Sequence, residues 1–153
     1  MKRNYAAPHG GHVAQTELLT GRAMFTEAYA VIPKGVMRDI VTSYLPFWEK
    51  TRLWVLARPP SGFAETFSQY IMEVSAGGGS DRPEPDAQAE AVLFTVEGNF
   101  TLHLAGKAHA MRPGSYAFIP PGAGWRLRND SKGPARFHWI RKAYEPVDGI
   151  EAP

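Results

Sequence analysis

Cysteine is absent from the 153 residues of this chain. Without thiols the chain can form no disulfide, carry no catalytic thiolate and bind no zinc or iron–sulfur cluster through cysteine. The chain also lacks an apolar run of about 18 residues, the length that a membrane-spanning helix requires. No charged segment followed by an apolar one opens the sequence, so no secretory leader is predicted. These absences predict a cytoplasmic protein that does not enter a membrane.

The excess of one charge over the other is small as well. The 17 basic and 15 acidic residues leave a formal net charge of +2, and both signs are spread along the chain. This balance does not favour nucleic acid or a membrane surface as a partner. Hydrophobic residues make up 44% of the chain and charged residues 21%, which is ordinary for a globular protein. Length and composition together predict one domain with a sizeable core.

Short runs rich in β-branched and aromatic residues recur along the chain, separated by clusters of glycine and proline. The chain has 15 glycines and 13 prolines, and no segment of about 12 residues shows a convincing helical period. Such runs and turns are typical of hairpins in an antiparallel sheet. They predict an all-β sandwich or barrel, most simply a jelly roll. The predicted strands lie at residues 23–32, 38–45, 52–58, 67–74, 91–96, 99–105, 107–112, 115–119, 125–128 and 136–142.

Three segments lack any strand pattern. Residues 1–21 are polar and broken by glycine, which predicts an N-terminal arm. Residues 75–90, "SAGGGSDRPEPDAQAE", are predicted to form a loop. Residues 144–153, "YEPVDGIEAP", are acidic and contain proline, so they resemble a linker, an unusual end for a complete protein. The predicted domain therefore spans residues 22–143.

The stretch "GSYAFIPPGAGWRLRN", residues 114–129, has the spacing G-x5-P-x-G-x2-W-x3-N. This spacing resembles the second sequence motif of the cupins, small β-barrels of the jelly-roll type. In such a frame glycine can take a positive φ in a tight turn, and proline can end a strand. Cupins carry a metal-binding histidine at the position where this chain has Trp125. An indole cannot take over that role.

The ligand positions of the first cupin motif are also replaced. Counting back from Gly98 across "VLFTVE" puts Ala91 at the glutamate position and Glu84 and Asp86 at the two histidine positions. Two carboxylates without an imidazole form a poor transition-metal site, although they would suit Mg²⁺ or Ca²⁺ better. We therefore predict a barrel that holds no metal and no cofactor.

Three residues near these motifs are candidates for contact with a ligand: Trp125, Glu90 and Arg126. Strand alternation points Trp125 into the barrel, where its indole either fills the vacant metal site or forms an aromatic wall for a small planar ligand. Glu90 precedes the vacant glutamate position, and the pleat places it on the opposite face. It is therefore either a surface or interface acid or a pocket residue.

Aromatic and basic residues outside the motifs add further candidates. Phe47 and Trp48 fall in a turn, and we expect them to be buried against another domain or subunit. His103 and His138 alternate with apolar residues in predicted strands, which is typical of histidines in a core or at its rim. Four basic residues near strand ends either line an anion pocket or remain solvated: Arg128, Arg136, Arg141 and Lys142.

Beyond the motifs, the chain resembles the N-terminal half of the bicupin (S)-ureidoglycine aminohydrolases, also called glyoxylate-induced proteins. The resemblance covers residues 15–150 and depends on the order of the motifs, including the acid at Glu90 and the linker pattern Y-x-P-V-D/E-G. The stretches that carry it are "LLTGRAMFTEAYAVIPKGVMRDIVTSYLPFW", "FAETFSQYIMEV", "AEAVLFTVEG", "GSYAFIPPGAGWRLRN" and "RFHWIRKAYEPVDG".

The resemblance implies a protein of two cupin domains that releases ammonia from (S)-ureidoglycine in allantoin and purine breakdown, using Mn²⁺. In that family the metal site belongs to the C-terminal cupin, so the resemblance assigns Trp125 to the half that holds no metal. No second cupin is present here, and no catalytic residue of the family can be transferred to this chain. We expect the isolated chain to be inactive and to have a structural role, with a second cupin domain or another copy of itself as partner.

Two other functions stay open from the residues alone. A stand-alone cupin without a metal could bind a small polar molecule, such as a ureide or a carboxylate, through Trp125, Arg126 and Glu90. A metal-dependent cupin enzyme, such as a dioxygenase or an isomerase, is disfavoured because the four ligand positions carry the wrong side chains.

Overall fold

A computed structural model describes residues 24–25, 29–31, 44–59 and 66–151. These ranges contain strands and no helix, which confirms the all-β prediction, and nowhere in them does a helix exist that could cross a membrane. The predicted arm and most of the run at 38–45 lie outside the described residues. The strands are β1 (Met24–Phe25), β2 (Ala30–Val31), β3 (Glu49–Ala57), β4 (Phe67–Ser80), β5 (Ala89–Glu97), β6 (Phe100–Leu104), β7 (Lys107–Met111), β8 (Tyr116–Ile119), β9 (Trp125–Arg128) and β10 (Ala135–Ala143).

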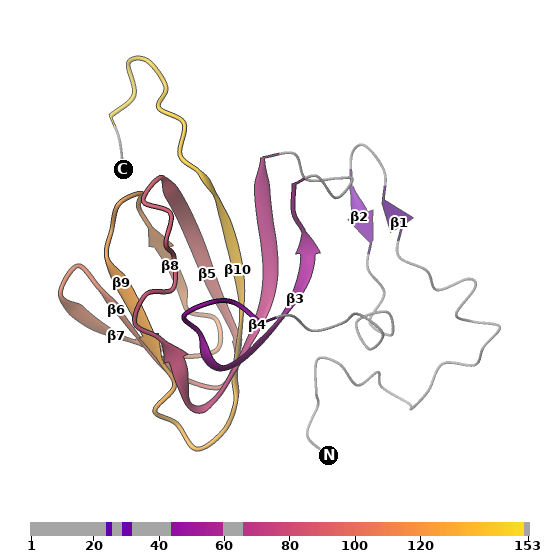
Figure 1. The fold of residues 1–153 in the computed structure, drawn as a ribbon, viewed down its shortest axis with the longest axis vertical. Coiled ribbons are helices and arrows are strands. Elements are labelled where there is room, and N and C mark those ends of the chain that lie inside the picture. Colours follow the sequence, from indigo (N-terminus) through magenta and orange to yellow (C-terminus); the bar gives the residue numbers. More distant parts are fainter. Residues whose placement is uncertain (1–23, 26–28, 32–43, 60–65, 152–153) are drawn as a thin grey trace.

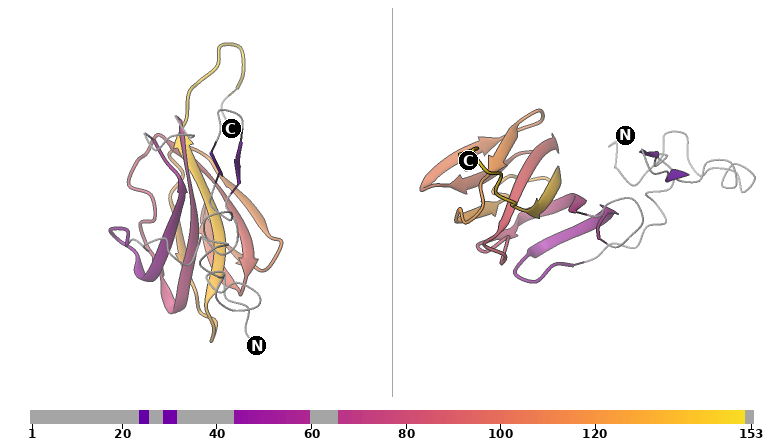
Figure 2. Two further views of the ribbon diagram at one scale, coloured as in Figure 1. Left: turned by 90° about the vertical axis from the view of Figure 1, so that its right-hand side faces the viewer. Right: turned by 90° about the horizontal axis from the view of Figure 1, so that it is seen from above.

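The larger sheet curls into an almost closed barrel of antiparallel strands (Figures 1 and 2). Its strand order is β7-β6-β9-β4-β10-β5-β8, with β3 paired to the free side of β4. The long strand β4 belongs to both halves of the barrel, because its first part pairs with β3 and β10 and its last two residues pair with β9. β1 and β2 form a separate two-stranded sheet. The cupin-like jelly roll predicted from the sequence is therefore the observed architecture.

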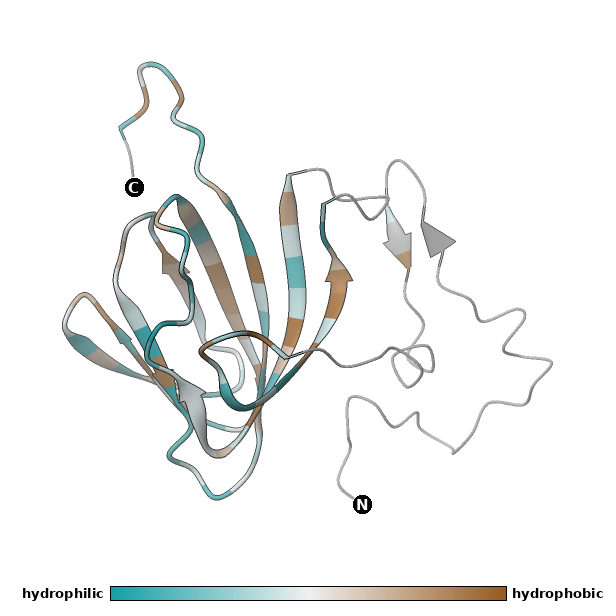
Figure 3. Cartoon of the chain, in the orientation of Figure 1, coloured by the Kyte–Doolittle hydropathy of each residue, from teal (hydrophilic) through white to brown (hydrophobic). Residues whose placement is uncertain are grey.

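The strands form where apolar and polar residues alternate, because successive side chains of a strand point to opposite faces. Along β10, Ala135, Phe137 and Trp139 belong to the buried core of the barrel. Figure 3 shows hydrophobic and hydrophilic stretches following one another along β4, where the strict alternation is lost because residues 70–74 are all buried. Burial of each large side chain stabilises the fold by about 1.5–3 kcal/mol. The core therefore lies inside the barrel, where a cupin holds its ligands.

The prediction of a loop over residues 75–90 is wrong in its first part, because β4 continues to Ser80. Glycines at positions 77–79 lack the side chains that mark a strand in a sequence. The missing side chains allow the backbones of β4 and β9 to approach each other, since a Cβ on Gly79 would overlap the carbonyl oxygen of Leu127. The strand ends at Ser80, and no strand is formed again until Ala89.

Asn129, the last residue of the cupin-like motif at residues 114–129, stabilises this contact between β4 and β9. Its Nδ2 donates to the carbonyl oxygens of Val74 at 2.8 Å and Gly133 at 2.9 Å, and its Oδ1 accepts from the backbone N–H of Ser131 at 3.0 Å. The side chain is fully buried and its polar groups are satisfied. Asparagine at this position is therefore explained by the closure of the barrel, without reference to a ligand.

Candidate functional site

An aromatic cluster fills the interior where cupins hold a metal. Trp125 is 8% exposed and its ring packs edge-on against Trp48 and Trp139, at centroid distances of 6.4 Å and 5.9 Å. Ala91 is buried in the same core. Of the two roles considered for Trp125, filling the vacant metal position is the one that fits its burial, because most of the surface of the side chain is packed in the core.

Trp48 belongs to this cluster, so the expectation that it is buried against another domain or subunit is wrong. Its Nε1 donates to the carbonyl oxygen of Pro83 at 3.2 Å, and its ring lies 5.6 Å from that of Trp139. Phe47 next to it points away from the core and is 57% exposed, with the guanidinium of Arg82 5.3 Å from its ring centre. The turn therefore packs Trp48 into the core of the chain's own barrel.

Glu84 is held at the edge of the interior by Arg141. The guanidinium donates from Nη2 to Glu84 Oε1 at 2.9 Å, and Nε lies 2.5 Å from Oε2. Burial raises the pKa of Glu84, while the backbone amide of Asp86 and the charge of Arg141 act in the opposite direction. Arg141 also lies 5.9 Å from the ring centre of Trp139. The carboxylate at this cupin position is therefore bound by a cation of the protein.

The residues at the four ligand positions do not fit Mn²⁺ or another transition metal. Trp125 and Ala91 offer no donor atom, and the guanidinium of Arg141 competes with any cation for Glu84. Asp86 is exposed, and its Oδ1 caps the backbone N–H of Gln88 at 2.9 Å. Across the described ranges, no three His, Asp or Glu side chains are grouped closely enough to hold a metal ion.

The three candidate ligand contacts are divided between two places. Trp125 and Arg126 line a cavity of about 430 Å³ beside the barrel interior, which we call the rim pocket. Glu90 lies on the outer side of β5, facing away from the interior that Ala91 enters, and its Oε1 is 3.7 Å from Lys142 Nζ. It lines a different cavity, so Glu90 cannot act together with Trp125 on one small ligand.

The four basic residues near strand ends do not form an anion pocket, because each of them is paired with a carboxylate of the chain. Two of them bind acids across neighbouring strands, and Arg136 is buried rather than solvated. The ion pairs are Arg128 with Glu49 and Asp81, Arg136 with Glu73 and Glu97, Arg141 with Glu84, and Lys142 with Glu90.

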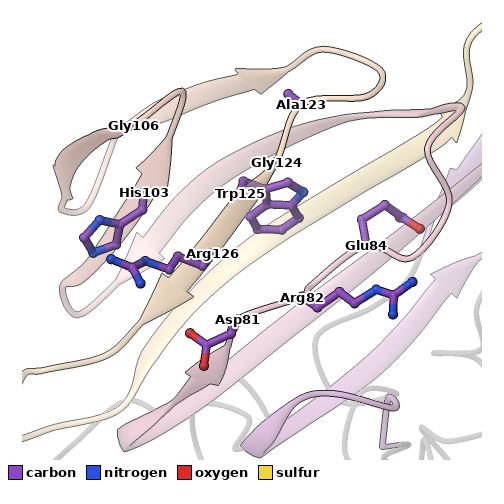
Figure 4. A pocket seen from close by; sticks show the side chains of 9 residues that line it. All are labelled: Asp81, Arg82, Glu84, His103, Gly106, Ala123, Gly124, Trp125 and Arg126. Atoms are coloured by element: carbon purple, nitrogen blue, oxygen red, sulfur yellow. The ribbon is translucent and has the colours of Figure 1, made fainter.

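The rim pocket also contains residues that lie far apart in the sequence. Arg82 follows the end of β4, and His103 of β6 is the direct neighbour of Arg126 across the β6–β9 pair. Figure 4 shows the indole of Trp125 between Arg126 and His103 on one side and Arg82 and Glu84 on the other. No local pattern joins positions 82, 103 and 126, which the β6–β9 register and the path of the chain after β4 bring to one pocket.

The outer face of the sheet carries an apolar surface that we call the outer patch. It consists of Val92, Phe94, Tyr116, Phe118 and Ile140 on β5, β8 and β10. Cross-strand pairing places Val92 between Phe118 and Ile140, and Phe94 beside Tyr116. The four largest of these side chains are between 36% and 62% exposed. A contiguous exposed apolar surface of this kind is typical of a protein–protein contact.

The comparison with known proteins agrees with the geometry. The cupin domain family matches residues 70–141. A putative glyoxylate-induced protein from Pseudomonas aeruginosa is 65% identical over 99% of this chain, with a TM-score of 0.80. The (S)-ureidoglycine aminohydrolase of Escherichia coli K12 is 26% identical over 135 residues, or 87% of this chain. The chain has the cupin fold and resembles the ureidoglycine aminohydrolase and glyoxylate-induced protein family. The E. coli protein YlbA, 24% identical over 90% of this chain with a TM-score of 0.72, shares the fold.

This cupin spans about half the length of the relatives it matches. It covers 49% of the E. coli aminohydrolase and 55% of the P. aeruginosa protein. The comparison therefore shows the fold of this cupin. It does not assign the activity of the complete relatives to this chain.

A Glu84→Gln variant of the cupin should become more stable relative to the wild type as pH rises from about 4 to about 7. Because the folded-state pKa of Glu84 is raised above 4.5, its contribution to stability is fully present below that value. The contribution is lost as pH rises through the raised pKa. Glutamine keeps an acceptor for Arg141 and does not titrate. Urea unfolding at several pH values measures the difference, and a difference that stays constant would contradict the prediction.

Proposed function

We propose that this chain is the non-catalytic cupin of an (S)-ureidoglycine aminohydrolase-like protein of the cytoplasm. In this proposal a second cupin domain holds the Mn²⁺ and the catalytic residues for release of ammonia in allantoin and purine catabolism. The present cupin supports that domain and its assembly. The relatives, which are about twice as long as this chain, support the proposal.

The filled interior supports a role without a metal. A cupin that polarises its substrate through a metal needs an open coordination position and several donor side chains. Here the indole of Trp125 and the guanidinium of Arg141 lie at or beside those positions. The chain alone is therefore proposed to hold no Mn²⁺ and to hydrolyse no ureidoglycine.

The outer patch is the observation that carries the structural role. Phe94, Tyr116 and Phe118 are exposed on a face whose last strand, β8, ends the described sheet order. The ion pair of Glu90 and Lys142 lies at one border of this face, so an apolar centre is flanked by polar groups. Protein interfaces commonly have this arrangement. A second cupin domain is the proposed occupant, because the matched relatives contain a further segment of similar length.

The test is to mix this chain with the remaining half of the P. aeruginosa relative and to measure the mass of the species in solution. We expect a complex of one copy of each, and ureidoglycine hydrolysis in the presence of Mn²⁺ only in samples that contain the second cupin. A Tyr116→Asp, Phe118→Asp double variant should weaken association by at least about tenfold, since apolar anchors carry most interface energy.

The control is Val147→Asp, which changes an exposed apolar side chain of the tail and should leave association unchanged. Circular dichroism checks that each variant is folded. The proposal is wrong if the chain pairs only with itself, if no complex forms, or if the isolated chain hydrolyses ureidoglycine.

A further inference from the structure

A histidine, His138, lies in the middle of the outer face of the barrel. On β10 it is paired with Ile71 of β4 on one side and with Phe94 of β5 on the other. Ile71 is in turn opposite Trp54 of β3, and Phe94 is opposite Tyr116 of β8. Directly paired residues of neighbouring strands share one face of the sheet. A single row of side chains therefore crosses five strands, and His138 is its centre, beside the outer patch.

The acids on this face of the described strands are each paired with a cation. Glu73 lies diagonally across from His138 on β4, and it accepts from Arg136 Nε at 2.6 Å and from Arg52 Nε at 2.7 Å. The other two acids of the face form ion pairs as well. A carboxylate that is already paired attracts a further proton only weakly. The charged and titratable groups that share the face with His138 in these strands are Arg52, Glu73, Glu90, Glu97, Tyr116, Arg136 and Lys142.

The imidazole of His138 is half-buried among its apolar neighbours. Burial lowers the pKa of this ring below its ordinary value, so it is uncharged at neutral pH. In acid the ring takes up a proton, and water still reaches its exposed part while the outer patch is free. A partner that covers the patch removes this water, and a charge in apolar surroundings without water is costly. Protonation of His138 and covering of the outer patch therefore oppose each other.

We propose that His138 makes docking of the second cupin domain on the outer patch depend on pH. The inference rests on the proposed function, because that function assigns the second domain to this patch. The neutral imidazole admits an apolar partner surface, and the imidazolium excludes it. Association is then full at neutral pH and weakens as pH falls through the pKa of His138 in the free cupin. By the reciprocity of linked binding, the docked partner lowers the pKa of His138 further.

The test measures association of this chain with the remaining half of the P. aeruginosa relative at about pH 7.5 and about pH 5. On acidification the dissociation constant of the wild type should rise at least about threefold more than that of a His138→Gln variant, because glutamine is polar but does not titrate. Titrating groups of the partner act equally on both chains and cancel in this comparison. An NMR titration of the wild-type imidazole, which needs no variant, should show a lower pKa for His138 with the partner bound than without it.

His103→Gln is the matched control, because His103 lines the rim pocket and lies outside the outer patch. It should keep the pH dependence of the wild type. Circular dichroism checks that every chain is folded in acid, since a histidine with a lowered pKa contributes stability above about pH 6.5 that is lost as pH falls toward the folded-state pKa. If a complex forms at neutral pH but acid weakens the wild type and His138→Gln equally, or the pKa of His138 is the same in both states, this inference is wrong and the proposed function stands. If no complex forms at either pH, both are wrong.

Discussion

A Gly98→Ala variant should lose at least about 3 kcal/mol of folding free energy, because the new methyl group would overlap backbone that cannot move aside. Gly98 lies in the turn between β5 and β6 with a φ of +74°. A Cβ there would meet the carbonyl oxygen of Pro134 and would lie 2.8 Å from the Cα of Ala135. Relief would require the start of β10 to shift, and β10 pairs with both β4 and β5.

Gly106→Ala separates this clash from the cost of the backbone conformation. Gly106 has a φ of +76°, and no atom lies within 4 Å of the position of its Cβ. Its replacement should cost only about 1–2 kcal/mol, the penalty for an L-residue in the left-handed region. Urea unfolding of both variants gives the comparison. Equal losses of stability would show that β10 does not constrain Gly98.

A Glu73→Gln variant should lose about 3–5 kcal/mol, since removal of one partner leaves a buried charge uncompensated. Glu73 on β4 lies opposite Arg136 on β10, and the two side chains are 7% and 5% exposed. Glu73 Oε2 accepts from Arg136 Nε at 2.6 Å, and Oε1 accepts from Arg52 Nε at 2.7 Å. Glu97 also accepts from Arg136, at 2.8 Å, and would still partly compensate its charge in the variant, which places the expected loss near the lower end of that range.

Glu49→Gln is the control for this pair, because Glu49 also binds an arginine but its side chain is 70% exposed. A surface ion pair of this kind contributes at most about 1 kcal/mol. Thermal and urea unfolding should therefore show a much smaller loss for Glu49→Gln than for Glu73→Gln. Similar losses for the two variants would mean that the buried ion pair stabilises the fold no more than the exposed one.

Much of the fold could be predicted from the sequence, because its signals are local. Alternating apolar residues and turn glycines placed nearly all the strands of the barrel, including Trp125–Arg128 and Ala135–Ala143 within a residue or two. The spacing around Trp125 indicated a cupin, and that fold is observed. The extension of β4 to Ser80 could not be predicted, since glycines in a strand carry no apolar pattern.

The candidate site was predicted less well than the fold. Trp125 and Arg126 line one cavity, whereas Glu90, which the pleat of its strand already placed on the opposite face, lines a different one. Arg82 had no signal, and His103 was predicted only as a histidine in a core or at its rim. They line the same pocket as Arg126 because of the pairing between β6 and β9 and the path of the chain after β4. Trp48 was placed at an interface from its turn, although the barrel itself buries it.

The sequence by itself determined the class of fold and the loss of the cupin ligands, since both follow from which residue types stand at which spacing. Only the tertiary structure decided which charged side chains pair with one another. Glu84 and Arg141 are 57 positions apart, and Asp81 and Arg128 are 47 apart, so register and loop path alone bring each pair together. The attraction between opposite charges is strong only at short distance, and closeness between distant positions is a property of the folded chain.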